Sequence, residues 1–294
     1  MFKILAREDL APVTKLFRIK APLVARKAQP GMFVVVRLDE EGERIPLTIA
    51  DWDRREGSVT VIFQEVGAST RRMGALKAGD SVLDFIGPLG LPSEIEKFGT
   101  VIMVGGGVGI APIYPVARAL KKAGNRVISI IGARNQELLF WEEKMRAVSH
   151  ELIVTTDDGS YGRRALVTEP LKEKLEAAAN AGAPIDRVVA IGPGIMMKFC
   201  AKTTQPFGVH TIVSINSIMV DATGMCGACR ISVGGQTKFV CVDGPDFDGH
   251  LVDWDLLMAR QRQYLDEEKR ANEVYAEKCQ RCKDEELAHA QGVS

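Results

Sequence analysis

The chain has 294 residues, more than one hydrophobic core usually serves, so we expect two or three domains. Lysine plus arginine and aspartate plus glutamate each number 38, which leaves no basic field for nucleic acid or an anionic membrane surface. The first residues contain no apolar signal segment, and no run of about 18 apolar residues occurs, so we expect a cytoplasmic protein without a membrane span.

Residues 1–98 are predicted to form an antiparallel β-barrel. Short stretches rich in β-branched and aromatic residues alternate there with turns that contain glycine, and this regular spacing is typical of a small barrel. The predicted strands cover residues 32–38, 45–50, 58–64 and 81–86.

Residues 99–217 are predicted to form a doubly wound α/β domain, because apolar strands alternate with helices. The strands are expected at residues 100–104, 126–131, 152–155, 187–191 and 210–214, and the first helix at 112–123. Ligands of such a sheet bind beyond the carboxyl ends of its strands, where four turns lie. Their candidate binding residues are Gly105, Gly106, Gly107, Gly109, Ala111, Pro112, Gly132, Ala133, Arg134, Asp157, Asp158, Gly159, Gly192, Pro193, Gly194 and Met197.

The first of these turns is a glycine loop that opens a helix, where backbone N–H groups and the positive end of the helix dipole can face a pyrophosphate. Arg134 follows the second strand, where the ribose of adenosine is normally bound. Each turn alone also fits a structural role: strand–helix packing for the glycines, an ordinary turn for Asp157 and Asp158, and helix packing for Met197. Together the four turns favour a nucleotide site.

Residues 218–256 contain four potential metal ligands, one aspartate and three cysteines, in the spacing Asp221-x4-Cys226-x2-Cys229-x11-Cys241. Thiolates are the ligands that iron–sulfur clusters select, and a plant-type [2Fe–2S] site uses this spacing with cysteine in the first place. We therefore predict a small [2Fe–2S] domain. Three alternatives remain open: a structural zinc site, a redox dithiol, and buried inert cysteines.

Asp221 departs from the four-cysteine pattern. A carboxylate is a harder and less electron-donating ligand than a thiolate, so we expect Asp221 to make the cluster easier to reduce. The alternative is that Asp221 only caps the loop by accepting backbone N–H bonds.

Residues 257–294 are predicted to form a charged helical tail. Cys279 and Cys282 lie three apart on one helix face, but a lone pair lacks the other ligands of a closed metal site, so we expect both to be dispensable. The apolar residues nearby indicate that the helix docks onto the protein or a partner.

The motifs at 105–112 and 191–197 resemble the nicotinamide domain of the ferredoxin–NADP reductase superfamily, in which a barrel of the kind predicted before them binds flavin. The cluster loop that follows makes the chain similar to the electron-transfer subunits of dihydroorotate dehydrogenase B. With aspartate as first ligand and the long tail, it looks most like the small subunits of NADH-dependent reduced ferredoxin:NADP oxidoreductases.

The resemblance implies FAD contacts on two barrel strands and a following turn. Ile45 stands where the family often has an arginine, so the charge on the flavin pyrophosphate must be met elsewhere. Barrel packing and turn capping are the alternative roles. The implied contacts are Pro46, Leu47, Thr48, Ile62, Phe63, Gln64, Gly67, Ser69 and Thr70.

The resemblance also implies an oxidoreductase in which NAD(H) exchanges hydride with FAD, and FAD exchanges single electrons with [2Fe–2S]. No acid–base or nucleophilic side chain is required. The expected partner is a larger subunit that carries FAD and [4Fe–4S] clusters, in a heterodimer that performs electron bifurcation. A dihydroorotate dehydrogenase B-like subunit, a stand-alone flavin reductase and a zinc-stabilised binding module are the alternatives.

Overall fold

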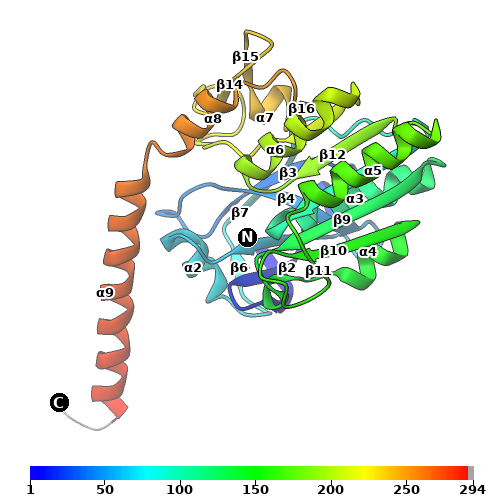
Figure 1. Cartoon of the computed structure of the whole chain (residues 1–294). Helices are drawn as coiled ribbons and strands as arrows, with labels where there is room; N and C mark the ends of the chain where they lie inside the picture. The colour runs from blue at the N-terminus through cyan, green and yellow to red at the C-terminus, as the bar shows by residue number, and fades with distance from the viewer. Residues whose placement is uncertain (291–294) are drawn as a thin grey trace.

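The computed structural model describes residues 1–290, with side chains described up to residue 279 (Figure 1). The chain builds two seven-stranded sheets, a small hairpin and a helical C-terminus. This arrangement confirms the expected fold class. None of the described helices combines the length and the apolar character needed to cross a bilayer.

The N-terminal sheet is an antiparallel barrel with strand order β6-β1-β2-β5-β4-β3-β7. Strands β6 and β7 lie at opposite ends of this order, yet only Leu83 separates them along the chain. The Leu83 N–H donates to the carbonyls of Arg37 and Leu38 at 3.0 and 3.1 Å, so one continuous segment closes the sheet. The elements are β1 (Phe2–Ala11), β2 (Thr14–Lys20), α1 (Pro22–Lys27), β3 (Phe33–Arg37), β4 (Ile45–Asp53), β5 (Ser58–Gln64), α2 (Ala68–Gly74), β6 (Ser81–Val82) and β7 (Asp84–Leu89).

The barrel interior is filled by alternate side chains of each strand. Phe17 and Phe63 meet edge to face with ring centroids 5.1 Å apart, and both are fully buried. Strands β1 and β2 are missing from the sequence prediction. Charged residues such as Arg7, Glu8 and Asp9 hide the alternation of β1, because its polar side is long and solvated.

The second sheet has the order β11-β10-β9-β8-β12-β13-β16 and is parallel except for β16. Helices α3 and α4 cover one face, α5 and α6 the other (Figure 1). The elements are β8 (Thr100–Gly106), η1 (Gly107–Gly109), α3 (Ile110–Lys122), β9 (Arg126–Ala133), η2 (Gln136–Leu138), α4 (Glu142–Val148), β10 (Glu151–Thr156), β11 (Arg163–Arg164), α5 (Thr168–Ala181), β12 (Arg187–Ile191), α6 (Gly194–Thr204), η3 (Gln205–Phe207) and β13 (Thr211–Ser214).

The C-terminal part surrounds a hairpin whose turn is Gly234-Gly235. Its last strand, β16, leaves the predicted cluster domain and pairs antiparallel with β13, with Phe247 opposite Val213. The elements are β14 (Arg230–Val233), β15 (Gln236–Phe239), α7 (Val240–Asp243), β16 (Asp246–Asp248), α8 (Trp254–Gln261) and α9 (Leu265–Ala290). The predicted cluster segment thus adds one strand to the nicotinamide sheet, and the domain boundary at residue 218 stays a prediction.

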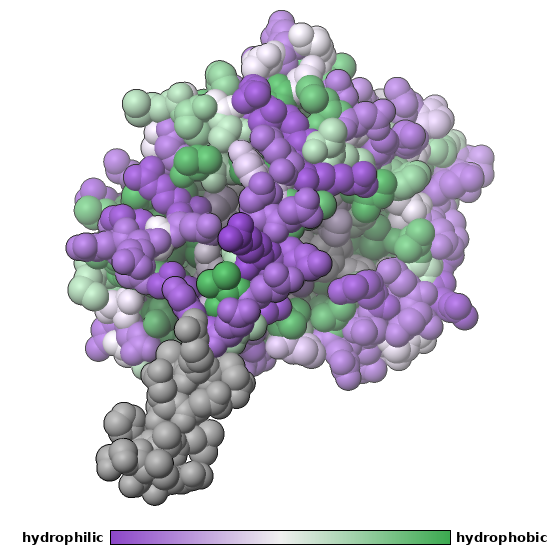
Figure 2. Space-filling view, turned by 90° about the vertical axis from the view of Figure 1, so that its left-hand side faces the viewer, coloured by the Kyte–Doolittle hydropathy of each residue, from purple (hydrophilic) through white to green (hydrophobic). Residues whose placement is uncertain are grey.

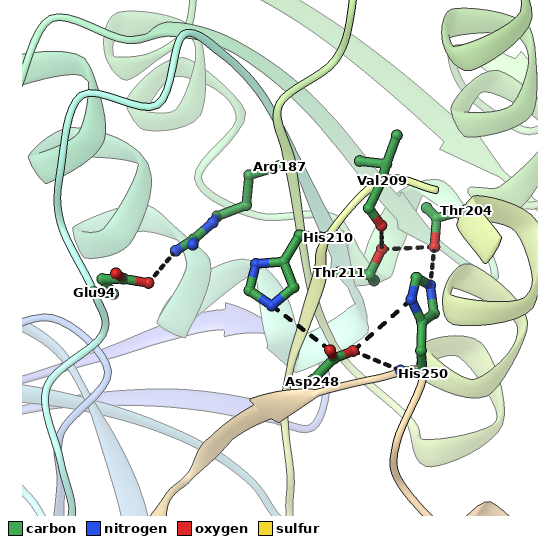
Figure 3. A network of polar contacts seen from close by, with 8 residues as sticks. All are labelled: Glu94, Arg187, Thr204, Val209, His210, Thr211, Asp248 and His250. Carbon is green, nitrogen blue, oxygen red and sulfur yellow. Dashed lines mark hydrogen bonds and ion pairs between the residues drawn. The ribbon is translucent and has the colours of Figure 1, made fainter. Parts of the chain in front are cut away.

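Polar contacts hold β16 to its neighbours (Figure 3). Asp248 lies 3.7 Å from the Nε2 of His210 and 3.8 Å from the Nδ1 of His250, and the other nitrogen of the His250 ring lies 2.9 Å from the hydroxyl of Thr204 on α6. The linker from the barrel joins in, because the Ser93 hydroxyl donates to Asp246 at 2.6 Å. Barrel, sheet and cluster segment therefore meet at β16.

Candidate functional site: three cofactor loops around one sheet edge

The glycine loop after β8 lies directly against the loop after β12. Gly105 and Ile191 are partners across the two strands. A Cβ on Gly109 would lie 2.1 Å from the carbonyl oxygen of Ile191, and a Cβ on Gly192 would lie 3.0 Å from that of Gly106. The glycines permit this close approach, and no side chain caps the first N–H groups of α3 by a hydrogen bond, so these groups can bind a pyrophosphate.

Met196, and not its neighbour Met197, lies over the glycine loop. A Cβ on Gly106 would lie 2.2 Å from the Met196 sulfur, so the Met196 side chain lies over the glycine loop. Met197 is buried in the core beneath α6, at 1% exposure. Since neighbouring residues of a helix point about 100° apart, the sequence motif alone did not decide between them. Met196 therefore joins the candidate contacts of the nicotinamide, and the role of Met197 as a contact stays a prediction.

The turns after β9 and β10 are joined through their backbones. The N–H of Asp157 donates to the Ala133 carbonyl at 3.1 Å, and that of Asp158 to the Arg134 carbonyl at 3.2 Å. The Ser160 hydroxyl and N–H bond to the Asp158 carboxylate and lower its pKa. Arg134, Asp157 and Asp158 are exposed at the edge where the predicted nucleotide site lies. Their role as cofactor contacts stays a prediction.

The predicted flavin residues on strands β4 and β5 differ in how deeply their side chains are buried. Pro46, Leu47 and Thr48 on β4 are half-buried, whereas Ile62 packs between barrel and α3 and Phe63 points into the barrel. Only the backbone of the latter two can reach a ligand on the outside of the barrel.

The turn before α2 is held together by its own side chains. The Thr70 hydroxyl accepts from the N–H groups of Val66 and Gly67 at 3.1 Å each, and Ser69 bonds to Glu43. Thr70 therefore has the capping role that was considered for it. Gly67, Ser69 and Thr70 stay predicted FAD contacts.

The four predicted cluster ligands form two close pairs. The Cys226 sulfur lies 3.2 Å from Oδ1 of Asp221, and the Cys229 and Cys241 sulfurs lie 3.3 Å apart. Cys226 is exposed, whereas Cys229 and Cys241 are buried, and burial raises the pKa of Cys241. Two pairs of donors suit two irons that each take two protein ligands.

The donor arrangement differs from that of a mononuclear site. Among the described residues, no three His, Cys, Asp or Glu side chains gather in a way that could hold a single metal ion. The hydroxyl of Ser217, which is buried and lines the same cavity of about 240 Å³ as Cys226, has no hydrogen-bond partner among the described residues. The residues thus fit a two-iron cluster better than a single zinc ion.

Asp221 has the loop-capping role considered for it, and its carboxylate also lies beside a predicted ligand. Its carboxylate accepts from the N–H groups of Thr223, Met225 and Cys226 at 3.1 to 3.2 Å, and these bonds, that of Thr223 first, lower its pKa to about 2. It caps the loop and also faces the Cys226 sulfur as an anion. Its place in the ligand set stays a prediction.

The predicted tail cysteines are only partly described. Cys279 is half-buried on α9, and the side chain of Cys282 lies outside the described residues. Helix α9 contacts the turn before α2, where the Asn272 amide donates to the Val66 carbonyl at 3.4 Å, and then extends past the body of the protein (Figure 1).

A barrel followed by a nicotinamide-type sheet and a two-iron thiolate loop defines the class of flavin- and iron–sulfur-containing NAD(P)H oxidoreductases. Two family models match the chain: the iron–sulfur cluster binding domain of dihydroorotate dehydrogenase B over residues 216–253, and the oxidoreductase NAD-binding domain over residues 103–202. The first match favours an iron–sulfur cluster over the structural zinc site that the cysteine spacing left open.

Whole-chain relatives are more specific. The chain is 50% identical over 253 residues to the dihydroorotate dehydrogenase B (NAD(+)) electron transfer subunit homolog of Thermotoga maritima, covering 86% of this chain and 88% of that one. It is 32% identical over 245 residues to the dihydroorotate dehydrogenase B (NAD(+)) electron transfer subunit of Fusobacterium nucleatum, covering 81% and 92%. The chain therefore belongs to the family of dihydroorotate dehydrogenase B electron-transfer subunits and their homologues.

A solved structure agrees with this placement. The chain is 46% identical, with a TM-score of 0.88, to a structure of the NADH-dependent reduced ferredoxin-NADP oxidoreductase, covering 94% of this chain and 98% of that one. The resemblance found in the sequence is confirmed, as are the oxidoreductase class and the cofactor set of FAD, [2Fe–2S] and NAD(H). The chain is an electron-transfer subunit, and the family implies a partner subunit.

Proposed function

We propose that this chain is the small subunit of an electron-bifurcating NADH-dependent reduced ferredoxin:NADP oxidoreductase. The main support is the 46% identity to that enzyme over 94% of the chain. The identity to the dihydroorotate dehydrogenase B electron transfer subunit of Fusobacterium nucleatum is lower, at 32%. Aspartate in the first ligand position points the same way.

The chain's residues bind and separate the redox groups. The glycine loops after β8 and β12 hold the nicotinamide nucleotide, and the outer face of β4 with the turn at Gly67 holds FAD. Flavin converts a two-electron hydride into single electrons, and a [2Fe–2S] cluster carries one electron at a time. The protein supplies no proton donor or nucleophile to this reaction.

The partner is a larger subunit that carries FAD and [4Fe–4S] clusters, in a heterodimer. The cluster loop suits a contact with it, because Cys226 is exposed and the neighbouring Met225 is 89% exposed. On the face shown in Figure 2, hydrophilic residues predominate and hydrophobic residues occur in small separate areas. A partner on that face is therefore recognised by shape and polar contacts more than by a broad apolar surface.

Purification from the native cells tests the proposal. The chain should co-purify with a larger iron–sulfur flavoprotein, and the complex should reduce NADP⁺ with NADH only when reduced ferredoxin is also supplied. NADP⁺ reduction that does not require ferredoxin would contradict it.

Dihydroorotate dehydrogenase B is the second candidate, because the family model over residues 216–253 bears that name. In that case the chain should co-purify with a dihydroorotate-oxidising subunit, and dihydroorotate should reduce NAD⁺ through the complex. The two assays on one preparation distinguish the candidates.

A further inference from the structure

Two arginines bind the two carbonyls that lie between Cys226 and Cys229. The Arg230 guanidinium donates to the Gly227 carbonyl at 3.1 Å, and the Arg260 guanidinium donates to the Ala228 carbonyl at 3.0 Å. Arg230 is only three residues from its acceptor, whereas Arg260 comes from α8, which packs against β14 (Figure 1). Arg260 is the long-range contact of the pair.

The first of these peptides shows what such a bond does. In a trans peptide the C=O and the N–H point in opposite directions. With its carbonyl held by Arg230, the peptide between Gly227 and Ala228 directs the Ala228 N–H to the Cys226 sulfur at 3.4 Å. By the same geometry, a bond from Arg260 to the Ala228 carbonyl fixes the Cys229 N–H on the opposite side of that peptide.

Arg260 also brings a positive charge close to the exposed ligand. It lines the cavity of about 240 Å³ that Cys226, Ala228 and Arg230 line as well. Hydrogen bonds to the sulfurs and nearby positive charge both favour the reduced, more negative state of a cluster. The next residue, Gln261, donates to the Asn216 carbonyl at 2.5 Å, so the end of α8 holds both ends of the loop.

We propose that Arg260 is a positioning residue of the iron–sulfur centre, which fixes the peptide between Ala228 and Cys229 and raises the reduction potential of the cluster. The proposal rests on the predicted ligands Cys226 and Cys229, and it holds for either complex considered above. Arg260 touches the loop backbone and takes no part in electron transfer itself.

The test compares Arg260→Gln and Arg260→Lys with the matched control Arg262→Gln in the holoprotein. Arg262 lies two residues further along the chain and is exposed, and its replacement by glutamine removes the same charge. The readouts are iron and sulfide per chain, the cluster potential by redox titration, and the electron paramagnetic resonance spectrum of the reduced cluster.

Arg260→Gln should keep the cluster at a lower potential with an altered spectrum, while Arg262→Gln matches wild type and Arg260→Lys recovers most of the potential. Loss of the cluster in Arg260→Gln but not in Arg260→Lys also supports the positioning role. Unchanged potential and spectrum in Arg260→Gln, or an equal change in Arg262→Gln, overturns it. Wild-type protein without iron would instead refute the cluster assignment itself.

Discussion

Replacement of Gly109 by alanine tests the contact between the two nicotinamide loops. Gly109 has ordinary helical backbone angles, φ −62° and ψ −12°, at the start of α3. Gly109 is the N-cap residue of α3, so alanine gains there at most the about 0.5–1 kcal/mol by which it is favoured inside a helix. Here the new Cβ would lie 2.1 Å from the Ile191 carbonyl oxygen and 2.9 Å from the Cα of Gly192. Both obstacles are backbone atoms, so β12 and α3 must move apart.

Overpacking of this kind costs about 1–3 kcal/mol, which exceeds the gain in helix propensity. Gly109→Ala should therefore be destabilised by about 1–2 kcal/mol, a drop in melting temperature of roughly 2–8 °C for a chain of this size. The displaced loop should also weaken NADH binding by about tenfold, since each 1.4 kcal/mol is a factor of ten.

Thermal melting and NADH titration of the holoprotein measure both effects. Asn180→Ala is the control, because Asn180 is exposed in the last turn of α5, at the helix end away from the carboxyl ends of the strands. Asn180→Ala should leave NADH affinity unchanged. A Gly109→Ala protein that melts at or above the wild-type temperature and binds NADH normally would refute the reasoning.

Four further predictions follow from the site. Asp221→Cys should keep the cluster at a lower reduction potential, and an unchanged potential and resonance signal would remove Asp221 from the ligand set. Asp246→Asn should raise the melting temperature at neutral pH, because burial raises the pKa of Asp246 and its ionisation opposes folding; the gain should vanish as the pH falls below the unfolded value of 3.8. NADH should reduce the flavin more efficiently than NADPH, and the reverse order would make Arg134 a phosphate ligand. The double variant Cys279→Ser, Cys282→Ser should retain all its iron and activity.

Local sequence patterns predicted the elements that consist mainly of buried apolar residues. Strand β8 was expected at 100–104 and runs over Thr100–Gly106, and α3 was expected at 112–123 and runs over Ile110–Lys122. An uninterrupted apolar run followed by glycines leaves few alternatives. Strands β1 and β2 were missed, because their exposed sides carry charges that conceal a period of two.

The spacing of the cysteines predicted the candidate ligands of the site. It did not predict which residues from distant parts of the chain pack against these loops. Met196 and Met197 are equivalent in a motif, and only packing of α6 shows which one lies at the loop. Arg260 lies 32 residues from Ala228 in a helix that looked like the start of a charged tail. No local signal marks a contact of that separation, since it depends on how α8 returns to the hairpin.

Strand β16 gives the cluster segment a second task. By pairing with β13 it covers what is otherwise the open edge of the nicotinamide sheet, where unpaired N–H and C=O groups would face solvent. The bond from Ser93 to Asp246 and the contacts of Asp248 with His210 and His250 help to keep this strand in place. Without β16, the bared β13 would be a template on which two chains could join edge to edge.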